Sequence, residues 1–428
     1  MRKVLRSLCF VIVLTLVNFG LLVATFCLPV SEMRENIARS SELFNYEGTY
    51  PHWDTGYKST KLDGWTEGAV YGMAIYEEGG SPLTNAILMH YIDAEGEQMP
   101  WSMTNYANHA DKNYSFPVYG RYWYGSVGII KTLLLLFDVG DIRMLNCILQ
   151  ITLSILILIK MIRLGLDDRI IPLAVGIMII EPLSMIMCLT YSSDYIPMLL
   201  AVLTILYLYE YVDKFGWMEF FAVLGAVMAF FSMLSFPLIA LGIPLLVKIW
   251  CDSVYGNRHK NELVDTIVCS GAWGIAYGIA WGMKWIIGTV FTDFDFIGNA
   301  FNQATGYYGE AEVTVIERLF KNVRVIIKWP YLLMFIIAIV IIIGMRVRSR
   351  QVNTGKEVTD VTTGLNNEIL SDVKTIIAYV IIALMPFAMM IALGDGYANT
   401  HYWMAYKQLS ITACAGLCII RDFRFKGK

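Results

Sequence analysis

The sequence predicts an all-α integral membrane protein with about ten transmembrane helices and a long, partly helical first loop outside the cytoplasm. Three observations predict it: the composition, the apolar runs and the placement of the basic residues. The 428-residue chain is 57% hydrophobic and 16% charged, whereas an ordinary soluble protein carries roughly 25% charged residues. We therefore expect lipid to solvate most of the chain.

Ten apolar runs are candidates for membrane helices, since a helix that crosses a bilayer needs roughly 17 to 25 residues. An even number of crossings places both termini on the same side of the membrane. The runs lie near 8–28, 142–162, 170–190, 195–212, 217–235, 236–250, 265–290, 325–345, 375–394 and 404–420.

The basic residues agree with this count. Under ten crossings, every flanking group of lysines and arginines falls in the cytoplasm, as the positive-inside rule requires. Both termini are then cytoplasmic. The groups are Arg2, Lys3 and Arg6; Lys160, Arg163 and Arg169; Lys214; Lys248, Arg258 and Lys260; Arg346, Arg348, Arg350 and Lys356; and Arg421, Arg424, Lys426 and Lys428.

The stretch from Tyr122 to Phe137 is an alternative crossing that would invert everything after it. We interpret it instead as lying along the outer surface, with its aromatic end at the headgroups and Lys131 extending to the membrane surface. The turn between the runs 217–235 and 236–250 is short and apolar, which makes this pair the second weak point of the count.

The predicted organisation has three parts. Residues 1–28 form the first transmembrane helix, and residues 29–140 form an extracytoplasmic loop with surface helices and the candidate active site. Residues 141–428 form a transmembrane bundle with outer loops near 291–321 and 394–407 and a cytoplasmic loop near 346–372. Because long loops in compact proteins are usually functional, function is expected to face outward.

Charge and cysteine usage exclude several classes of protein. The net charge of −3, without a basic stripe interleaved with aromatics, argues against nucleic acid as a partner. None of the eight cysteines lies between residues 29 and 140, so no disulfide framework is expected there. A divalent metal is conceivable, because His52, Asp54, His109 and Asp111 are residue types that bind metal ions. Their spacing matches no compact metal-binding motif, so the sequence gives no support for such a site.

The stretch Lys61-Leu62-Asp63-Gly64-Trp65-Thr66-Glu67-Gly68 carries two carboxylates four residues apart. If residues 62–76 are helical, Asp63 and Glu67 share one face. Two acids held close can separate their pKa values, so that one stays ionised and accepts a proton. The alternative is a helix start, with Asp63 as N-cap and Glu67 facing solvent or a lysine.

Cations on the predicted outer side indicate an anionic partner such as a lipid phosphate. Arg121 lies among Tyr119, Tyr122, Trp123 and Tyr124, where its alternative is an arginine in an aromatic belt. Arg143 has an ion pair with Asp138 or Asp141 as its alternative. His401 and Lys407 precede the last run, where an interface histidine is the alternative.

Two further acids, Glu181 and Asp194, lie in or near the membrane, where acids are usually functional. Glu181 has a simpler alternative, which is to cap the backbone freed by Pro182.

The chain resembles the GT-C superfamily of polytopic glycosyltransferases, which use polyprenyl-phosphate sugars, and more narrowly bacterial membrane proteins of that layout. The resemblance rests on short motifs and on the long first outer loop. The motifs are Leu-Asp-x-x-Thr-acid at Leu62 to Glu67, Arg-Tyr-Trp-x-Gly at Arg121 to Gly125, Ile-Arg-x-x-Asn at Ile142 to Asn146, and a histidine with an aromatic and basic group from His401 to Lys407.

The resemblance implies transfer of a sugar from a lipid-phosphate donor to a cell-envelope glycan, lipid or protein at the outer face of a bacterial cytoplasmic membrane. Asp63 or Glu67 would be the base; Arg121, Arg143, His401 and Lys407 would bind the phosphate or donor. Sugar or acceptor contacts would come from Trp65, His109, Tyr122 and Trp123.

The sequence also departs from the family pattern. The loop has no DxD motif, and Glu32 or Glu35 is an alternative base. A transporter or flippase of a lipid-linked glycan is the rival function, and a membrane scaffold is a third.

Overall fold

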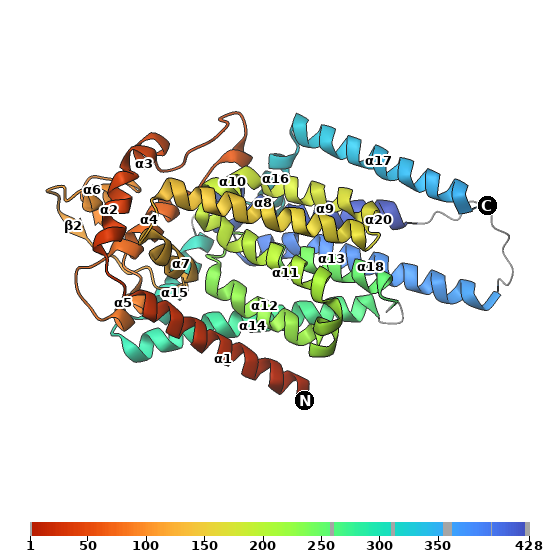
Figure 1. The fold of residues 1–428 in the computed structure, drawn as a ribbon, viewed down its shortest axis with the longest axis horizontal. Helices are drawn as coiled ribbons and strands as arrows, with labels where there is room; N and C mark the ends of the chain where they lie inside the picture. The colour runs from red at the N-terminus through yellow and green to blue at the C-terminus, as the bar shows by residue number, and fades with distance from the viewer. Residues whose placement is uncertain (1, 257–260, 310–312, 354–361, 395, 424–428) are drawn as a thin grey trace.

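The computed structural model describes residues 2–256, 261–309, 313–353, 362–394 and 396–423 (Figure 1). Within these residues the protein is almost entirely helical. The described sheet is a single antiparallel pair, β1 (Asp93–Ala94) and β2 (Tyr114–Ser115), in which Asp93 faces Ser115. The predicted all-α fold is confirmed.

Ten helices of the described residues form a bundle along the long axis of the molecule (Figure 1). Their apolar side chains face either one another or the outside, as membrane helices require when lipid replaces water. They are α1 (Arg2–Thr25), α8 (Val139–Arg163), α9 (Asp167–Ile180), α11 (Leu189–Phe215), α12 (Trp217–Phe231), α13 (Ile239–Val254), α14 (Glu262–Phe291), α17 (Trp329–Asn353), α18 (Thr362–Ala392) and α20 (Leu409–Asp422).

Seven helical segments of the described residues are long and apolar enough to cross a membrane, so a multi-pass membrane protein is confirmed. The other three bundle helices, α9, α12 and α13, have 14, 15 and 16 residues. The number of about ten crossings therefore stays a prediction. The seven segments are Lys3–Thr25, Val139–Arg163, Leu189–Phe215, Glu262–Phe291, Trp329–Val347, Val373–Ala392 and Tyr402–Asp422.

The run predicted near 170–190 is broken in the middle. Helix α9 ends at Ile180, Glu181 adopts a left-handed conformation with φ of 64°, and Pro182 begins the short helix α10 (Pro182–Met187). A proline disfavours a helical conformation in the residue before it, which explains the break. The break leaves the carbonyl of Ile180 available to a side chain.

The turn between α12 and α13 is held by an acid from a third helix. Asp194 of α11 is fully buried, and its Oδ2 accepts a hydrogen bond of 2.9 Å from the amide of Phe236. Buried backbone amides need a partner where a helix is interrupted. Asp194 therefore has a structural task in the described fold.

Each end of the bundle is held by its own polar contacts. At one end, Arg169 of α9 pairs with Asp422 of α20 at 2.8 Å. At the other end, Lys284 of α14 donates to the carbonyl of Ile87 in the first loop at 2.7 Å. The helices of the first loop gather at this second end, which lies on the left in Figure 1, while the start of α1 and the end of α20 lie away from it.

The first loop packs directly onto the bundle. Met33, Phe44 and Tyr71 of the loop share one buried apolar cluster with Leu22 of α1 and Ile142 of α8. The loop contains α2 (Ser31–Arg39), α3 (Ser41–Glu47), η1 (Lys58–Thr60), α4 (Gly64–Ile75), α5 (Pro82–Leu88), α6 (Trp101–Ala107) and α7 (Gly125–Leu134).

Helix α7 differs from the predicted surface segment. It packs against α4, and Lys131 is 1% exposed, with its Nζ donating to the carbonyl of Ala74 at 2.7 Å. The predicted extension of Lys131 to the membrane surface is wrong, because a backbone carbonyl inside the protein takes the place of water.

The remaining segments complete the loop end. They are α15 (Phe296–Gly309), α16 (Val315–Ile326), η2 (Gly396–Thr400), α19 (Tyr402–Ala405) and η3 (Tyr406–Gln408). In the predicted cytoplasmic loop near 346–372, residues 346–353 continue α17 and residues 362–372 begin α18. Residues 354–361 lie outside the described residues.

Candidate active site

Asp63 is the N-cap of α4. One carboxylate oxygen accepts from the amide of Thr66 at 3.2 Å, and the other accepts from the Thr66 hydroxyl at 2.7 Å. An aspartate here satisfies an otherwise unpaired amide of the first turn. The side chain is buried, with 7% of its surface exposed, and this burial raises the pKa of the carboxyl. The predicted cap is confirmed, and a cap and a proton acceptor are compatible roles.

Glu67 lies one turn further along α4 and is 2% exposed. Its Oε1 accepts from the amide of Leu189 at 3.3 Å, and its Oε2 lies 3.5 Å from Nη2 of Arg143. Burial raises the pKa of Glu67 to about 7, against the opposing effect of the Arg143 charge. The alternative in which Glu67 faces solvent or a lysine is wrong, because the loop is covered by α8 and the start of α11.

Arg143 projects from α8 into the loop. Its two terminal nitrogens contact the two carboxylate oxygens of Glu47 at 2.5 and 2.9 Å, a fork that matches a carboxylate in shape. The alternative pairing with Asp138 or Asp141 is not what the structure shows, since Asp138 caps α8 by accepting from the amide of Asp141 at 3.0 Å. Glu47 was not singled out from the sequence, because its partner lies 96 residues away.

Lys61 and His401 complete the surroundings of Asp63, where a positive charge on either side chain opposes the rise in the pKa of Asp63 that burial causes. Nζ of Lys61 stands 4.1 Å above the ring of Tyr50 and 4.4 Å above that of Trp403. Nδ1 of His401 lies 2.7 Å from the carbonyl oxygen of Gly396. The sequence analysis assigned no role to Lys61, although this residue begins the stretch that contains both acids.

Lys407 is fully buried beside this group. Its Nζ lies 3.0 Å from the carbonyl oxygen of Ile180 and 3.4 Å from that of Ser59, so it joins the α9 break to the first loop. Nearby, the hydroxyl of Tyr331 donates to Oε1 of Glu181. The structure thus gathers Asp63, Glu67, Arg143, His401 and Lys407 at the loop end of the bundle.

Arg121 belongs to a neighbouring aromatic cluster. Its guanidinium stands 4.2 Å above the ring of Tyr119 and 5.7 Å from that of Tyr122. Trp65 packs on the same Tyr119 ring at 5.9 Å, so the cluster is linked to Asp63 through the residue two positions after it. Tyr122 stacks on Trp281 at 5.7 Å. Aromatic rings thus separate Arg121 from the acids.

Two predicted contact residues lie elsewhere. Trp123 is fully buried, with its ring nitrogen donating to the carbonyl of Ala280 at 2.7 Å, so it presents no face to a sugar in this conformation. His109 is exposed in the turn after α6, with φ of 55°. Trp123 differs from expectation because tertiary packing covers α7 and its preceding turn.

No group of three or more His, Cys, Asp or Glu side chains suited to a metal ion occurs in the part of the chain that the structure describes. The conceivable set of His52, Asp54, His109 and Asp111 is therefore not assembled. All eight cysteines are free.

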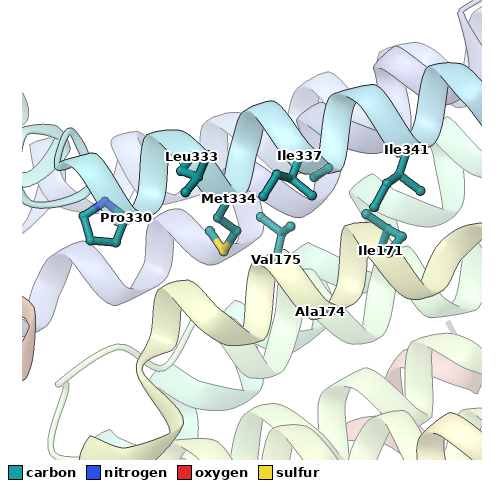
Figure 2. A pocket seen from close by; sticks show the side chains of 9 residues that line it. Ile171, Ala174, Val175, Pro330, Leu333, Met334, Ile337 and Ile341 are labelled. Carbon is teal, nitrogen blue, oxygen red and sulfur yellow. The ribbon is translucent and has the colours of Figure 1, made fainter.

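An apolar groove of about 400 Å³ lies between α9 and α17 (Figure 2). One wall carries Ile171, Ala174 and Val175 of α9, and the other carries Leu333, Met334 and Ile337 of α17. The groove begins at Pro330, next to Tyr331, and ends near Ile341, as Figure 2 shows.

Comparison with known proteins gives no match to any family model, any curated protein or any solved structure.

Proposed function

We propose that this protein is a membrane glycosyltransferase that transfers a sugar from a lipid-linked polyprenyl phosphate to an acceptor outside the cytoplasm. The observation that carries the proposal is the burial of Asp63 and Glu67 within one turn of α4, where Arg143 contacts Glu67 and where Lys61 and His401 lie near Asp63. Perturbed acids next to fixed cations are typical of catalytic sites. The alternative bases Glu32 and Glu35 are exposed on α2.

Asp63 suits the role of base better than Glu67. The Glu67 carboxylate is already engaged by Arg143 and by the amide of Leu189, so its role would be to hold α4 against α8 and the start of α11. The side chain of Asp63 accepts hydrogen bonds from a single residue, Thr66, and its burial raises the pKa of the carboxyl. A raised pKa makes the ionised carboxylate a stronger proton acceptor, which general-base catalysis requires.

The reaction balances as follows. The acceptor hydroxyl gives its proton to Asp63 while its oxygen forms a bond to the anomeric carbon of the donor sugar. The bond between that carbon and the phosphate oxygen breaks, and the electron pair leaves with the polyprenyl phosphate. Lys61, His401 and Lys407 would stabilise the negative charge that grows on the phosphate.

The acceptor and the compartment are part of the proposal. The acceptor would be a cell-envelope glycan, lipid or protein, and the site would open to the outer side of a bacterial cytoplasmic membrane. Trp65 and Tyr122, both half-buried, are candidates for packing against a sugar ring. Arg121, beside Tyr119 and Tyr122, is a candidate for binding the phosphate or the donor. No metal enters the scheme.

A transporter or flippase of a lipid-linked glycan is the alternative function. One observation favours it: the helix break at Glu181 and Pro182 interrupts a bundle helix beside a buried charge, Lys407, and interrupted membrane helices often bind transported solutes. The two functions differ in whether a covalent bond is broken.

The test uses purified protein in proteoliposomes with a panel of polyprenyl-phosphate sugars and an extract of envelope acceptors. Release of free polyprenyl phosphate is measured, because this product does not depend on the identity of the acceptor. The proposal expects release by the wild type, none by Asp63→Asn, and a strong reduction in Glu67→Gln. Movement of the intact donor across the bilayer without release of polyprenyl phosphate would favour the flippase function over the glycosyltransferase function. Unchanged release by both variants would refute the assignment of the acids.

A further inference from the structure

The groove between α9 and α17 has the length of one half of a bilayer. From Pro330 to Ile341 it spans eleven residues of helix, about 16 Å at roughly 1.5 Å per residue. The hydrocarbon core of a bilayer is about 30 Å thick, so one leaflet contributes about 15 Å. The groove is therefore about as long as one leaflet is thick.

The groove is open to the lipid. Its lining residues Leu333, Ile337 and Ile341 remain 40%, 50% and 40% exposed. Within the described residues, side chains that are both apolar and exposed on a membrane helix face hydrocarbon. A chain from the surrounding bilayer can therefore enter from the side.

Two cations come shortly before the groove-lining Pro330 in the chain. Arg324 of α16 and Lys328 lie four residues apart, and both are exposed; in the described part of the chain, neither forms an ion pair. Lys328 is two residues before Pro330, and Trp329 between them is 69% exposed, which is typical of a tryptophan at the headgroup level.

The other charged residues of α16 are Glu317, Arg318 and Lys321, of which Arg318 is buried. Lys321 turns inward, donating to Oδ1 of Asn399 at 2.7 Å and standing 4.5 Å above the ring of Tyr402. Glu317 caps the far end of α16 through Thr314. Arg324 is thus seven residues from Glu317, the carboxylate of α16, and Lys328 lies in the turn between α16 and α17.

We propose that the α9/α17 groove, with Arg324 and Lys328, binds one anionic phospholipid of the outer leaflet, its acyl chain in the groove and its phosphate on the two cations. This site is independent of the proposed sugar transfer. A phospholipid chain matches the length of one leaflet, whereas a polyprenyl chain is much longer than the groove. The acyl chain would contact α9 and α17 at the same time and would so hold the two helices together.

The experiment compares the protein in nanodiscs of phosphatidylcholine with and without phosphatidylglycerol. Native mass spectrometry counts the phosphatidylglycerol retained on the protein, and the melting temperature is recorded in parallel. We expect one retained molecule and a higher melting temperature with the anionic lipid. The double variant Arg324→Gln/Lys328→Gln should lower the affinity on the order of tenfold or more, because each cation near a surface adds to the attraction.

Two further variants separate a built site from general surface charge. Ala174→Phe fills the groove without changing the charge and should also abolish retention, whereas Arg163→Gln/Lys214→Gln removes two exposed cations at the other end of the bundle and should leave retention intact. Soluble glycerol phosphate should not compete, because it lacks the acyl chain.

Three results would overturn the proposal. Equal retention of phosphatidylcholine would remove the role of the cations, and full retention in Ala174→Phe would remove the role of the groove. Displacement of the retained lipid by stoichiometric polyprenyl phosphate would assign the groove to that lipid instead.

Discussion

Arg143 of α8 holds Glu47 of α3 in a two-pronged ion pair, with Nη1 2.5 Å from Oε1 and Nη2 2.9 Å from Oε2. The same Nη2 is 3.5 Å from Oε2 of Glu67. One guanidinium from the bundle therefore fixes two helices of the first loop. This arrangement places Glu67 one turn from Asp63 in a site that the loop and the bundle build together.

Replacing Arg143 should unfold the junction between loop and bundle. Arg143→Gln leaves Glu47 and Glu67 without their cation, and removing one partner of a buried ion pair costs about 3–5 kcal/mol. Thermal unfolding in detergent measures the loss. Arg163→Gln, at the exposed end of the same helix, is the control and should change stability by less than about 0.5 kcal/mol. A similar effect of both variants would contradict the role given to Arg143.

Stability should fall as the pH rises toward neutrality because of Glu67. Burial raises its pKa from 4.5 to about 7, so the unfolded chain releases this proton at lower pH than the folded protein does. The contribution of Glu67 to the unfolding free energy is therefore greatest below pH 4.5 and falls as the pH rises to about 7, by about 3 kcal/mol at the most. Melting temperatures from pH 4.5 to 7.5 test this.

Glu67→Gln is the matched variant for this pH dependence. It should flatten the slope, although burial of Asp63, whose pKa is also raised, leaves part of it. An unchanged slope in Glu67→Gln would show that Glu67 does not titrate in this range.

Asp63 should separate folding from activity. Asn accepts a hydrogen bond at an N-cap about as well as Asp, whereas Ala costs about 1 kcal/mol there. We therefore expect Asp63→Asn to lose donor cleavage and to melt close to the wild type. Asp63→Ala should lose donor cleavage and should also melt at a lower temperature. Melting curves and release of polyprenyl phosphate are read on the same preparations. An active Asp63→Ala would remove Asp63 from the mechanism.

The opposite end of the bundle should depend on Lys248. Its Nζ lies 2.6 Å from Asp252 and 2.7 Å from Asp265, and Lys248 and Asp252 are each 1% exposed. Lys248→Met leaves a buried carboxylate unpaired and should destabilise by about 3–5 kcal/mol. Asp265→Asn, which removes the more exposed partner, should cost clearly less. If the two variants melt alike, Asp252 does not need the lysine.

The placement of the loop outside the cytoplasm can be tested with a short epitope. Gly79 and Gly80 form an exposed turn of the first loop with positive φ, so an insertion there should be tolerated. In spheroplasts with an intact cytoplasmic membrane, an antibody should reach this epitope. It should reach an epitope fused to the N-terminus only after the membrane is permeabilised. The reverse pattern would invert the predicted topology.

The sequence alone determined that this is a helical membrane protein, because apolar runs of spanning length and few charges leave no soluble alternative. It also offered a helix start with Asp63 as N-cap as one of two interpretations of residues 62–76, since the signals of Asp63, Gly64 and Glu67 are local in the chain, and the structure confirms that cap. It did not determine the number of crossings, because α9, α12 and α13 are short and a proline ends α9 at Glu181. Hydrophobicity does not reveal such breaks.

Only the tertiary structure decided which charged residues meet. Arg143 contacts Glu47, not the nearby Asp138 or Asp141, because the first loop folds back onto α8 and excludes water there. Lys131 is covered by α4 of the loop and Trp123 by the bundle helices α1, α12 and α14, so a lysine and a tryptophan typical of a membrane surface became part of the core. Partners distant in sequence are set by packing, and no local pattern of residues encodes them.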